Sequence, residues 1–311
     1  MMAGPRYHSR PEEPMKRLLI TTAAVLAAAA ACAQDPHAEH QMATTALPTN
    51  TSVSQDWAKK KVDNSPRHHE WVNVKSGTRT VSAFVVYPEV KAKAPAVVVI
   101  HEIFGMSDWV QMLADEVAEA GYIAIAPDLL SGMGPEGGGT ASFADGTAVG
   151  KAIRDLPPDQ ITADLNAVAD YVAKLPAANG KVAVTGFCWG GTQSFRFATN
   201  RPSLSAAYVF YGSGPESADE IAKIKAPVYG FYAGNDARIG ATIPKTIELM
   251  KAAGKTFEPV TYEGAGHGFM RAGETPPPPA GADQKARDAW AGNKKARDEA
   301  WVRWKGLLKK L

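Results

Sequence analysis

The sequence predicts an α/β fold in which helices cover both faces of a mostly parallel, eight-stranded sheet. Residues 71–75 and 80–87 alternate between apolar and polar side chains on either side of Ser76-Gly77, which predicts an antiparallel hairpin. After this hairpin, short apolar runs alternate with segments of helical periodicity, as in a parallel sheet with crossover helices. A continuous apolar run such as residues 95–100 indicates a strand that is buried on both faces.

The remaining elements follow from the same two periodicities, which are those of a strand and of a helix. Further strands are expected at residues 122–126, 182–185, 206–211, 227–232 and 257–262. Helices are expected to begin after residue 105 and at residue 157, and to span residues 192–199, 243–253 and 286–311. In the last helix we expect a buried stripe formed by Trp301, Trp304, Leu308 and Leu311.

The glycine-rich segment 132–150 has neither periodicity. It also lacks the glycine-lysine-serine/threonine end of a phosphate-binding loop. We therefore expect this segment to be a mobile connection near the mouth of a site.

The composition is that of a globular protein, with 45% hydrophobic and 21% charged residues in a chain of 311. The length fits one α/β domain with additional segments. No basic patch with interleaved aromatic residues is present, so a nucleic-acid partner is not expected. No apolar run after residue 35 has the length of a membrane span.

The N-terminal 33 residues resemble a secretory signal peptide. Lys16-Arg17 forms the positive region, residues 18–31 are apolar, and Ala31-Cys32-Ala33 has the small-residue pattern of a cleavage site. Met15 lies at the ideal start of this segment and is a candidate initiator. The alternative is a lipid anchor at Cys32. In both cases we expect an exported protein, which is periplasmic, secreted or a lipoprotein. We expect a flexible linker at residues 34–65 and the α/β domain at residues 66–311.

The candidate nucleophile is Cys188, the one cysteine that remains after the signal peptide is removed. It lies between Gly186 and Gly190, directly after the predicted strand at residues 182–185, in the G-x-nucleophile-x-G pattern of a sharp strand–turn–helix elbow. The unpaired N–H groups of a helix N-terminus are expected to favour the thiolate. The alternative is a small buried side chain in an ordinary turn.

A thiol nucleophile needs a base, and the base needs a residue that orients it. Asp236 and His267 follow later strands, in the order nucleophile, acid, histidine. His267 would take the thiol proton and later activate water, and Asp236 would hold its tautomer. The alternatives are a helix-capping aspartate and a surface histidine.

Five ionisable residues lie just beyond the carboxyl ends of predicted strands, where the active sites of parallel sheets form. They are Glu102, Asp128, Cys188, Asp236 and His267.

Over residues 68–311 the sequence resembles the dienelactone hydrolase family of α/β-hydrolases. The resemblance depends on the cysteine elbow, on Asp236 and on four further features: His101-Glu102-Ile103-Phe104-Gly105, His267, Arg271 four residues later, and Ala300-Trp301-Val302-Arg303. The combination of the elbow with the motif at residues 101–105 is specific.

The resemblance implies a role for each matching residue. Cys188 would be the nucleophile of a triad with Asp236 and His267. Glu102 would control the protonation of the thiol, backbone N–H groups of Ile103 and Trp189 would form the oxyanion hole, and Arg271 would bind a substrate carboxylate. Family members that cleave dienelactone have a second arginine in the loop after the strand that ends in Pro-Asp, but residues 129–150 contain no arginine.

These features predict a carboxylic ester hydrolase that cleaves a lactone or an activated ester through a thioester. The alternatives are a broad exported esterase or thioesterase with the same triad, and a non-catalytic binding module. No cofactor is expected, and no metal, because Gly105 stands where a zinc-binding H-E-x-x-H motif needs its second histidine. The expected partner is a small ester or lactone, and the chain is expected to be a monomer or a small homo-oligomer.

Overall fold

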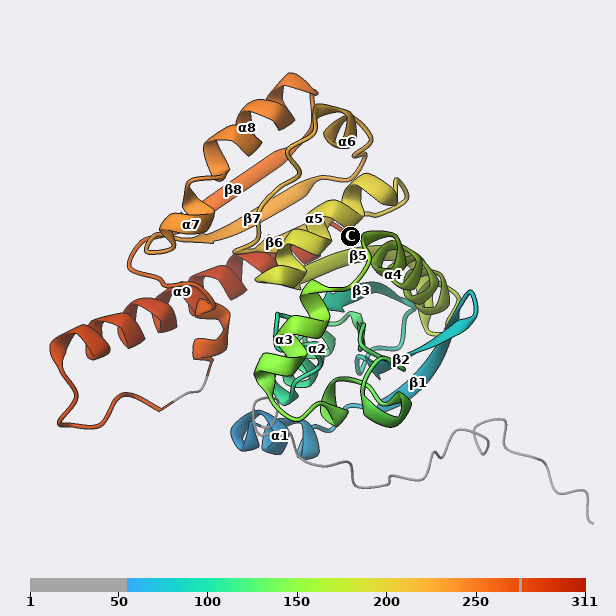
Figure 1. Ribbon diagram of the computed structural model, residues 1–311, viewed down its shortest axis with the longest axis horizontal. Helices are drawn as coiled ribbons and strands as arrows, with labels where there is room; N and C mark the ends of the chain where they lie inside the picture. Colours follow the sequence, from blue (N-terminus) through green and yellow to red (C-terminus); the bar gives the residue numbers. More distant parts are fainter. Residues whose placement is uncertain (1–54, 274–275) are drawn as a thin grey trace, which may run out of the picture. The chain divides into compact units, whose positions relative to one another are not determined.

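An eight-stranded sheet organises the part of the chain that the computed structural model describes, residues 55–273 and 276–311 (Figure 1). The strand order is β1-β2-β4-β3-β5-β6-β7-β8. Strand β2 is antiparallel to both of its neighbours, and every other neighbouring pair is parallel. The strands are β1 (His69–Ser76), β2 (Arg79–Val86), β3 (Ala94–Ile100), β4 (Ile123–Pro127), β5 (Ala178–Phe187), β6 (Ala207–Phe210), β7 (Val228–Ala233) and β8 (Phe257–Tyr262). The predicted mostly parallel, eight-stranded sheet is confirmed.

The central strands are apolar on both faces, as their uninterrupted hydrophobic runs predict. In β3 the side chains from Ala96 to Ile100 are buried, and β3 pairs with β5 from Val97↔Ala183 to Ile100↔Gly186. Edge strand β1 instead alternates exposed and buried residues. This register brings the carboxyl ends of β3 and β5 together, so that the chain leaves both strands at one edge of the sheet.

Helices lie on both faces of the sheet and form two hydrophobic clusters with it. One cluster contains α1 (Asp56–Asp63), α2 (Asp108–Glu119) and α9 (Gln284–Leu308), and the other contains α3 (Gly146–Arg154), α4 (Pro158–Ala173) and α5 (Trp189–Asn200). Short helices α6 (Ala218–Ala222) and α7 (Ala237–Gly240) and helix α8 (Ile243–Ala252) complete the order, with 3₁₀ turns η2 (Pro135–Gly137), η3 (Thr140–Ser142) and η4 (Phe269–Ala272). None of the helices in the described ranges has both the length and the apolar character that crossing a bilayer requires.

The prediction of a flexible linker over residues 34–65 is wrong for its described part, which begins at Gln55. Helix α1 occupies most of that part, and Ala58 and Val62, one helical turn apart, are buried in the same cluster as α2. A helix this short is not stable by itself and forms because these two side chains pack on the domain. Residues 1–54, which include the predicted signal peptide, Cys32 and the rest of the linker, lie outside the described residues.

The prediction of a mobile connection at residues 132–150 also needs correction. The segment contains η2 and η3, and α3 begins at Gly146 after a cap by Asp145. Thr140 is buried, and its N–H and hydroxyl donate hydrogen bonds of 2.7 and 2.6 Å to the carboxylate of Asp128. The segment is therefore held to the end of β4 by a buried carboxylate, which glycine content alone does not indicate.

The last helix supports the elbow strand through an aromatic contact. The ring of Trp304 is fully buried and lies 5.0–6.0 Å, between centroids, from the rings of Phe187, Tyr208 and Phe210. Leu308 is buried in the same cluster, whereas Trp301 and Leu311 are partly buried against it. The predicted buried stripe is confirmed for Trp304 and Leu308, whereas Trp301 is partly buried and Leu311 lies beyond the end of α9. Trp304 packs against Phe187, the residue that precedes Cys188.

We predict that Trp304→Ala lowers the free energy of unfolding by about 3–5 kcal/mol, because the truncation leaves a cavity among aromatic rings. Urea unfolding followed by circular dichroism measures the change. Val302→Ala is the matched control on the same helix, since Val302 is 68% exposed, and we expect a change within about 0.5 kcal/mol. Equal effects of the two substitutions would contradict this account of the core.

Candidate active site

Cys188 occupies a sharp turn between β5 and α5. Its backbone has φ 56° and ψ −117°, a conformation that is strained for a residue with a side chain. A Cβ on Gly186 would overlap the carbonyl of Gly190, and a Cβ on Gly190 would overlap the carbonyl oxygens of Ile100 and His101. Both flanking glycines are therefore required by close backbone contacts, as the G-x-C-x-G pattern predicts.

The sulfur of Cys188 lies among two backbone donors and one carboxylate. The backbone N–H groups of Trp189 and Ile103, the two predicted for the oxyanion hole, act on the thiol and lower its pKa. Burial raises the pKa of the thiol and the nearby charge of Glu102 raises it further, while the two N–H groups and Arg238 lower it. The N–H group at the helix N-terminus therefore favours the thiolate, as expected, but the net direction of the pKa shift is upward. Desolvation and a neighbouring anion outweigh the helix terminus.

Glu102 follows β3 and is 2% exposed. One carboxylate oxygen accepts a hydrogen bond of 3.4 Å from the hydroxyl of Tyr211, and the other lies 3.1 Å from Nε of Arg271. Burial raises the pKa of Glu102 to about 7, although Arg271 and Tyr211 oppose the increase. Near neutral pH this carboxyl group can therefore exchange a proton with its surroundings.

Asp236 and His267 come together as a hydrogen-bonded pair. Nδ1 of His267 lies 2.5 Å from Oδ2 of Asp236, which is 8% exposed. The other oxygen of Asp236 accepts a hydrogen bond of 3.2 Å from the N–H of Ile239, so the same carboxylate also caps α7. Asp236 therefore both caps a helix and holds the ring of His267, so the two interpretations offered for it are compatible. The remaining nitrogen, Nε2 of His267, has no hydrogen-bond partner in the described part of the chain, so it is not bonded to Cys188 in this state.

Tyr211 connects these groups, although the sequence analysis did not identify it. Its ring packs edge-on against His267 with 5.0 Å between centroids, and its hydroxyl reaches Glu102. It has φ 40°, a second strained residue beside the elbow, and burial raises its pKa well above the ordinary value. Its position directly after β6, at the same sheet edge as Cys188, is the signal that could have identified it.

Asp128, the fifth residue predicted at a strand end, lies apart from this group. Its carboxylate accepts hydrogen bonds from Thr140 and from the N–H of Leu130. It also faces His101, a fully buried histidine whose pKa burial lowers and whose ring stacks on Trp189. Asp128 therefore organises the loop after β4.

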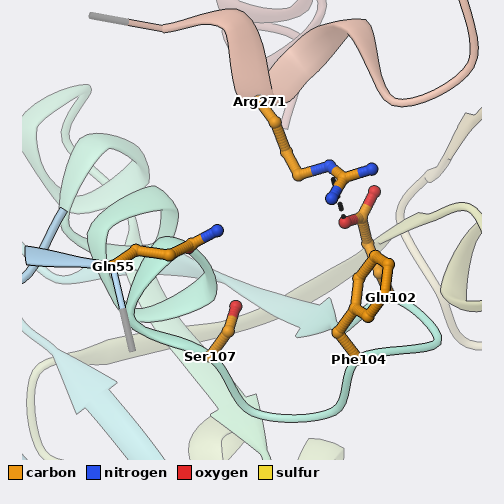
Figure 2. A pocket seen from close by; sticks show the side chains of 5 residues that line it. All are labelled: Gln55, Glu102, Phe104, Ser107 and Arg271. Atoms are coloured by element: carbon orange, nitrogen blue, oxygen red, sulfur yellow. Dashed lines mark ion pairs between the residues drawn. The ribbon is translucent and has the colours of Figure 1, made fainter. Parts of the chain in front are cut away.

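A small pocket opens beside Glu102 (Figure 2). The guanidinium of Arg271, predicted to bind a substrate carboxylate, pairs here with Glu102 and lies over the ring of Phe104, 5.0 Å from its centre. Gln55 and Ser107 complete the lining. Sequence reasoning missed both residues, because Gln55 falls in the segment assigned to the linker and Ser107 matches no motif. Among the described residues, no cluster of three or more histidine, cysteine, aspartate or glutamate side chains is arranged to hold a metal ion.

The sheet order, the elbow and the aspartate–histidine pair are those of an α/β-hydrolase. An esterase from Pyrobaculum calidifontis shares this fold, with 16% identity and a TM-score of 0.57 over 83% of this chain and 89% of that chain. Residues 81–311 match the dienelactone hydrolase family. This chain belongs to that family, and it is therefore a hydrolase that acts on carboxylic ester bonds.

Two relatives illustrate the family relationship. A putative carboxymethylenebutenolidase from Methylorubrum extorquens is 32% identical over 200 residues, which span 61% of this chain and 68% of that protein. The crystal structure of a putative dienelactone hydrolase from Klebsiella pneumoniae has a TM-score of 0.65 and 26% identity, and the match covers 79% of this chain and 99% of that chain.

We predict that Glu102→Gln makes Cys188 more reactive toward iodoacetamide near neutral pH. The substitution removes the negative charge that raises the pKa of the thiol, so the pH midpoint of alkylation should move down. Mass spectrometry of the peptide that contains Cys188 follows the reaction separately from Cys32. Glu248→Gln, at an exposed surface ion pair, is the control that should leave the midpoint unchanged. A midpoint that stays or moves up in Glu102→Gln would show that Glu102 does not hold the thiol protonated.

Proposed function

We propose that this enzyme hydrolyses a lactone or an activated ester through a thioester on Cys188, with His267 as the base and Asp236 as the residue that orients it. One observation carries the proposal. Cys188 sits on a strained turn at the N-terminus of α5, where the backbone N–H groups of Ile103 and Trp189 lower the pKa of its thiol. His267 is oriented by the buried Asp236, and its second nitrogen has no partner among the described residues. Nucleophile, donors for an oxyanion and an oriented base are what acyl transfer needs.

The resting arrangement supports a specific order of events. The thiol stays protonated while Glu102 is ionised, which protects it from unproductive reaction. When a substrate carbonyl oxygen takes the two N–H groups, the sulfur leaves them, and rotation about its Cα–Cβ bond brings it toward Nε2 of His267. His267 then accepts the thiol proton, and the thiolate attacks the carbonyl carbon. Each donor to the developing oxyanion contributes about 3 kcal/mol in enzymes of this type.

The second half of the reaction uses the same groups. The tetrahedral intermediate collapses to a thioester, and the imidazolium of His267 gives its proton to the leaving oxygen. Water then enters, His267 removes one of its protons, and hydroxide adds to the thioester carbonyl. Collapse of this second intermediate releases the carboxylic acid and returns the proton to the sulfur. Asp236 keeps Nδ1 of His267 protonated throughout and stabilises the imidazolium.

The chemistry of sulfur defines the substrate class. A thiolate is a good leaving group, so the first intermediate reverts unless the oxygen leaving group is also good. This favours lactones whose ring opens to an enolate, and aryl or enol esters, over amides. Arg271 would bind a substrate carboxylate through the nitrogens that Glu102 leaves free, as a charge-assisted pair.

A broader exported esterase or thioesterase is the second candidate, and one observation favours it. Residues 129–150 contain no arginine, so Arg271, already paired with Glu102, is the one cation lining the pocket among the described residues. Comparing the hydrolysis of dienelactone with that of p-nitrophenyl esters separates the two candidates. A non-catalytic binding module would not need Cys188, and it would keep its full biological effect in Cys188→Ala.

The proposed location of the enzyme is outside the cytoplasm. The basic, apolar and small-residue regions of residues 15–33 support export. The N-terminus of the protein recovered from the periplasm or medium tests this. A chain that begins after Ala31 or Ala33 agrees with export, and cytoplasmic protein with residues 15–33 intact contradicts it.

We predict that alkylation of Cys188 by one equivalent of iodoacetamide abolishes ester hydrolysis, because the thiolate is the nucleophile. Mass spectrometry confirms the site of labelling, and a Cys32→Ser chain is the control that should lose activity to the same extent. Unchanged turnover after complete labelling of Cys188 would refute the assignment of the nucleophile.

We also predict that Asp236→Asn lowers kcat by roughly 10²-fold or more, because the amide no longer holds the reactive tautomer of His267. Asparagine retains an oxygen that can cap α7, so the fold should persist. Asp219→Asn, an exposed aspartate in the first turn of α6, is the matched control. Steady-state kinetics with an aryl ester measures both variants, and equal kcat values would remove Asp236 from the mechanism.

A further inference from the structure

The pocket beside Glu102 contains two polar side chains that no step of the proposed reaction uses. Gln55 comes from the residue before α1, and Ser107 from the residue before α2. Gln55 lies outside the range that matches the family, residues 81–311. Figure 2 shows the Gln55 amide nitrogen and the Ser107 hydroxyl directed toward the space in front of Arg271 and Glu102.

At the N-terminus of α2, the side chain of Gln55 caps the helix in place of Ser107, which explains why both side chains face the pocket. Ser107 is in the N-cap position, where a serine hydroxyl normally accepts a helix N–H, yet its side chain makes no cap hydrogen bond. Oε1 of Gln55 accepts the N–H of Trp109 at 3.0 Å instead, and the backbone N–H of Gln55 donates to Asp108 at 2.7 Å. The hydroxyl of Ser107, a residue 6% exposed, is thereby released from capping.

The same contacts define the orientation of the Gln55 amide. Because the partner of its oxygen is an N–H group, Oε1 must face Trp109 and Nε2 must face the pocket. Within residues 55–273 and 276–311, Nε2 of Gln55 and Oγ of Ser107 have no protein partner. Trp57, in the first turn of α1, lies beside Gly273 in the segment that carries Arg271. Helix α1 therefore contacts both walls of the pocket.

The free hydrogen-bonding capacity of the pocket is mostly donor capacity. Both oxygens of Glu102 are already engaged, by Tyr211 and by Nε of Arg271. The remaining guanidinium N–H groups of Arg271, the Gln55 amide and the Ser107 hydroxyl can all donate, beside the positive end of the α2 dipole. A group with several acceptor oxygens and a negative charge satisfies them best.

We propose that Gln55 and Ser107 are specificity-determining residues, which bind a carboxylate of the substrate together with Arg271. This inference rests on the proposed function, since it assigns a remote part of the ester to this pocket. Under this proposal, Gln55 at the start of α1 forms part of the substrate site, although it lies outside the family-matched residues 81–311. The selectivity of the enzyme for carboxylate-bearing esters therefore depends on a residue before that region.

The test compares two esters that differ at one end, mono-p-nitrophenyl glutarate and p-nitrophenyl valerate. Gln55→Glu keeps an oxygen for Trp109 but replaces the donor with a negative charge. We expect the ratio of kcat/KM for the glutarate ester over the valerate ester to fall about tenfold or more, mainly through KM. Ser107→Ala should lower the ratio about threefold to tenfold. Gln284→Glu, the same change at the start of α9 and outside the pocket lining, should leave both constants unchanged.

The outcomes separate this inference from the proposed function. If wild-type protein hydrolyses both esters and Gln55→Glu leaves their ratio unchanged with an unchanged melting temperature, the specificity assignment is overturned and the esterase proposal stands. If wild-type protein hydrolyses neither ester, the proposed function fails with these substrates, and calorimetric titration with glutarate then tests the subsite by itself. Weaker glutarate binding to Gln55→Glu than to wild type supports the assignment, and equal binding overturns it.

Discussion

The close approach of backbone to backbone at the elbow is the constraint on which the site depends. Gly186 at the end of β5 and Gly190 in α5 leave no room for a Cβ, because each contacts a carbonyl of a neighbouring segment. Gly191 and Gly212 form a second such contact, between α5 and the residues that follow β6. These contacts hold Cys188 in a strained conformation and bring the N–H of Trp189 beside that of Ile103. The aromatic cluster around Trp304, below Phe187, supplies packing energy that the strained turn needs.

The electrostatics of the site follow from burying a carboxyl group next to a thiol. Glu102 has a pKa of about 7 in the folded chain, above its ordinary value of 4.5, and desolvation is the main cause. Between these pH values the folded state binds this proton more tightly than the unfolded state, so the contribution of Glu102 to stability falls as the pH rises through that window. The fold accepts this loss of stability at a position where the charge of Glu102 adds to burial in raising the pKa of the Cys188 thiol. Arg271 and Tyr211 reduce the increase in the pKa of Glu102, and Arg271 also lines the pocket.

Much of the fold and part of the site could be predicted from the sequence, for physical reasons that differ between residues. Runs such as β3 are buried on both faces, so their composition alone identifies them, and residues just after such strands meet at one edge of a parallel sheet. That rule identified Cys188, Asp236 and His267 as candidates, of which the structure pairs Asp236 with His267. It did not give the direction of the thiol pKa, which depends on how deeply the sulfur is buried and on the distance to Glu102. Gln55 escaped detection because α1 forms only through tertiary packing, and a local pattern carries no record of that packing.

The site combines groups that differ in how strongly the fold constrains them. Glu102 and Cys188 follow β3 and β5 in the middle of the sheet, where register and burial permit little variation, whereas Asp236 and His267 follow β7 and the edge strand β8. The pocket wall is made by segments at the margin: the residue before α1, the start of α2 and turn η4. The segment at α1 contacts the core through few side chains such as Ala58 and Val62, whereas the start of α2 contacts the elbow strand through Trp109, 5.2 Å between centroids from Phe187. In this chain, one glutamine connects these segments, because Gln55 both caps the helix that follows residues 101–105 and lines the pocket beside Glu102.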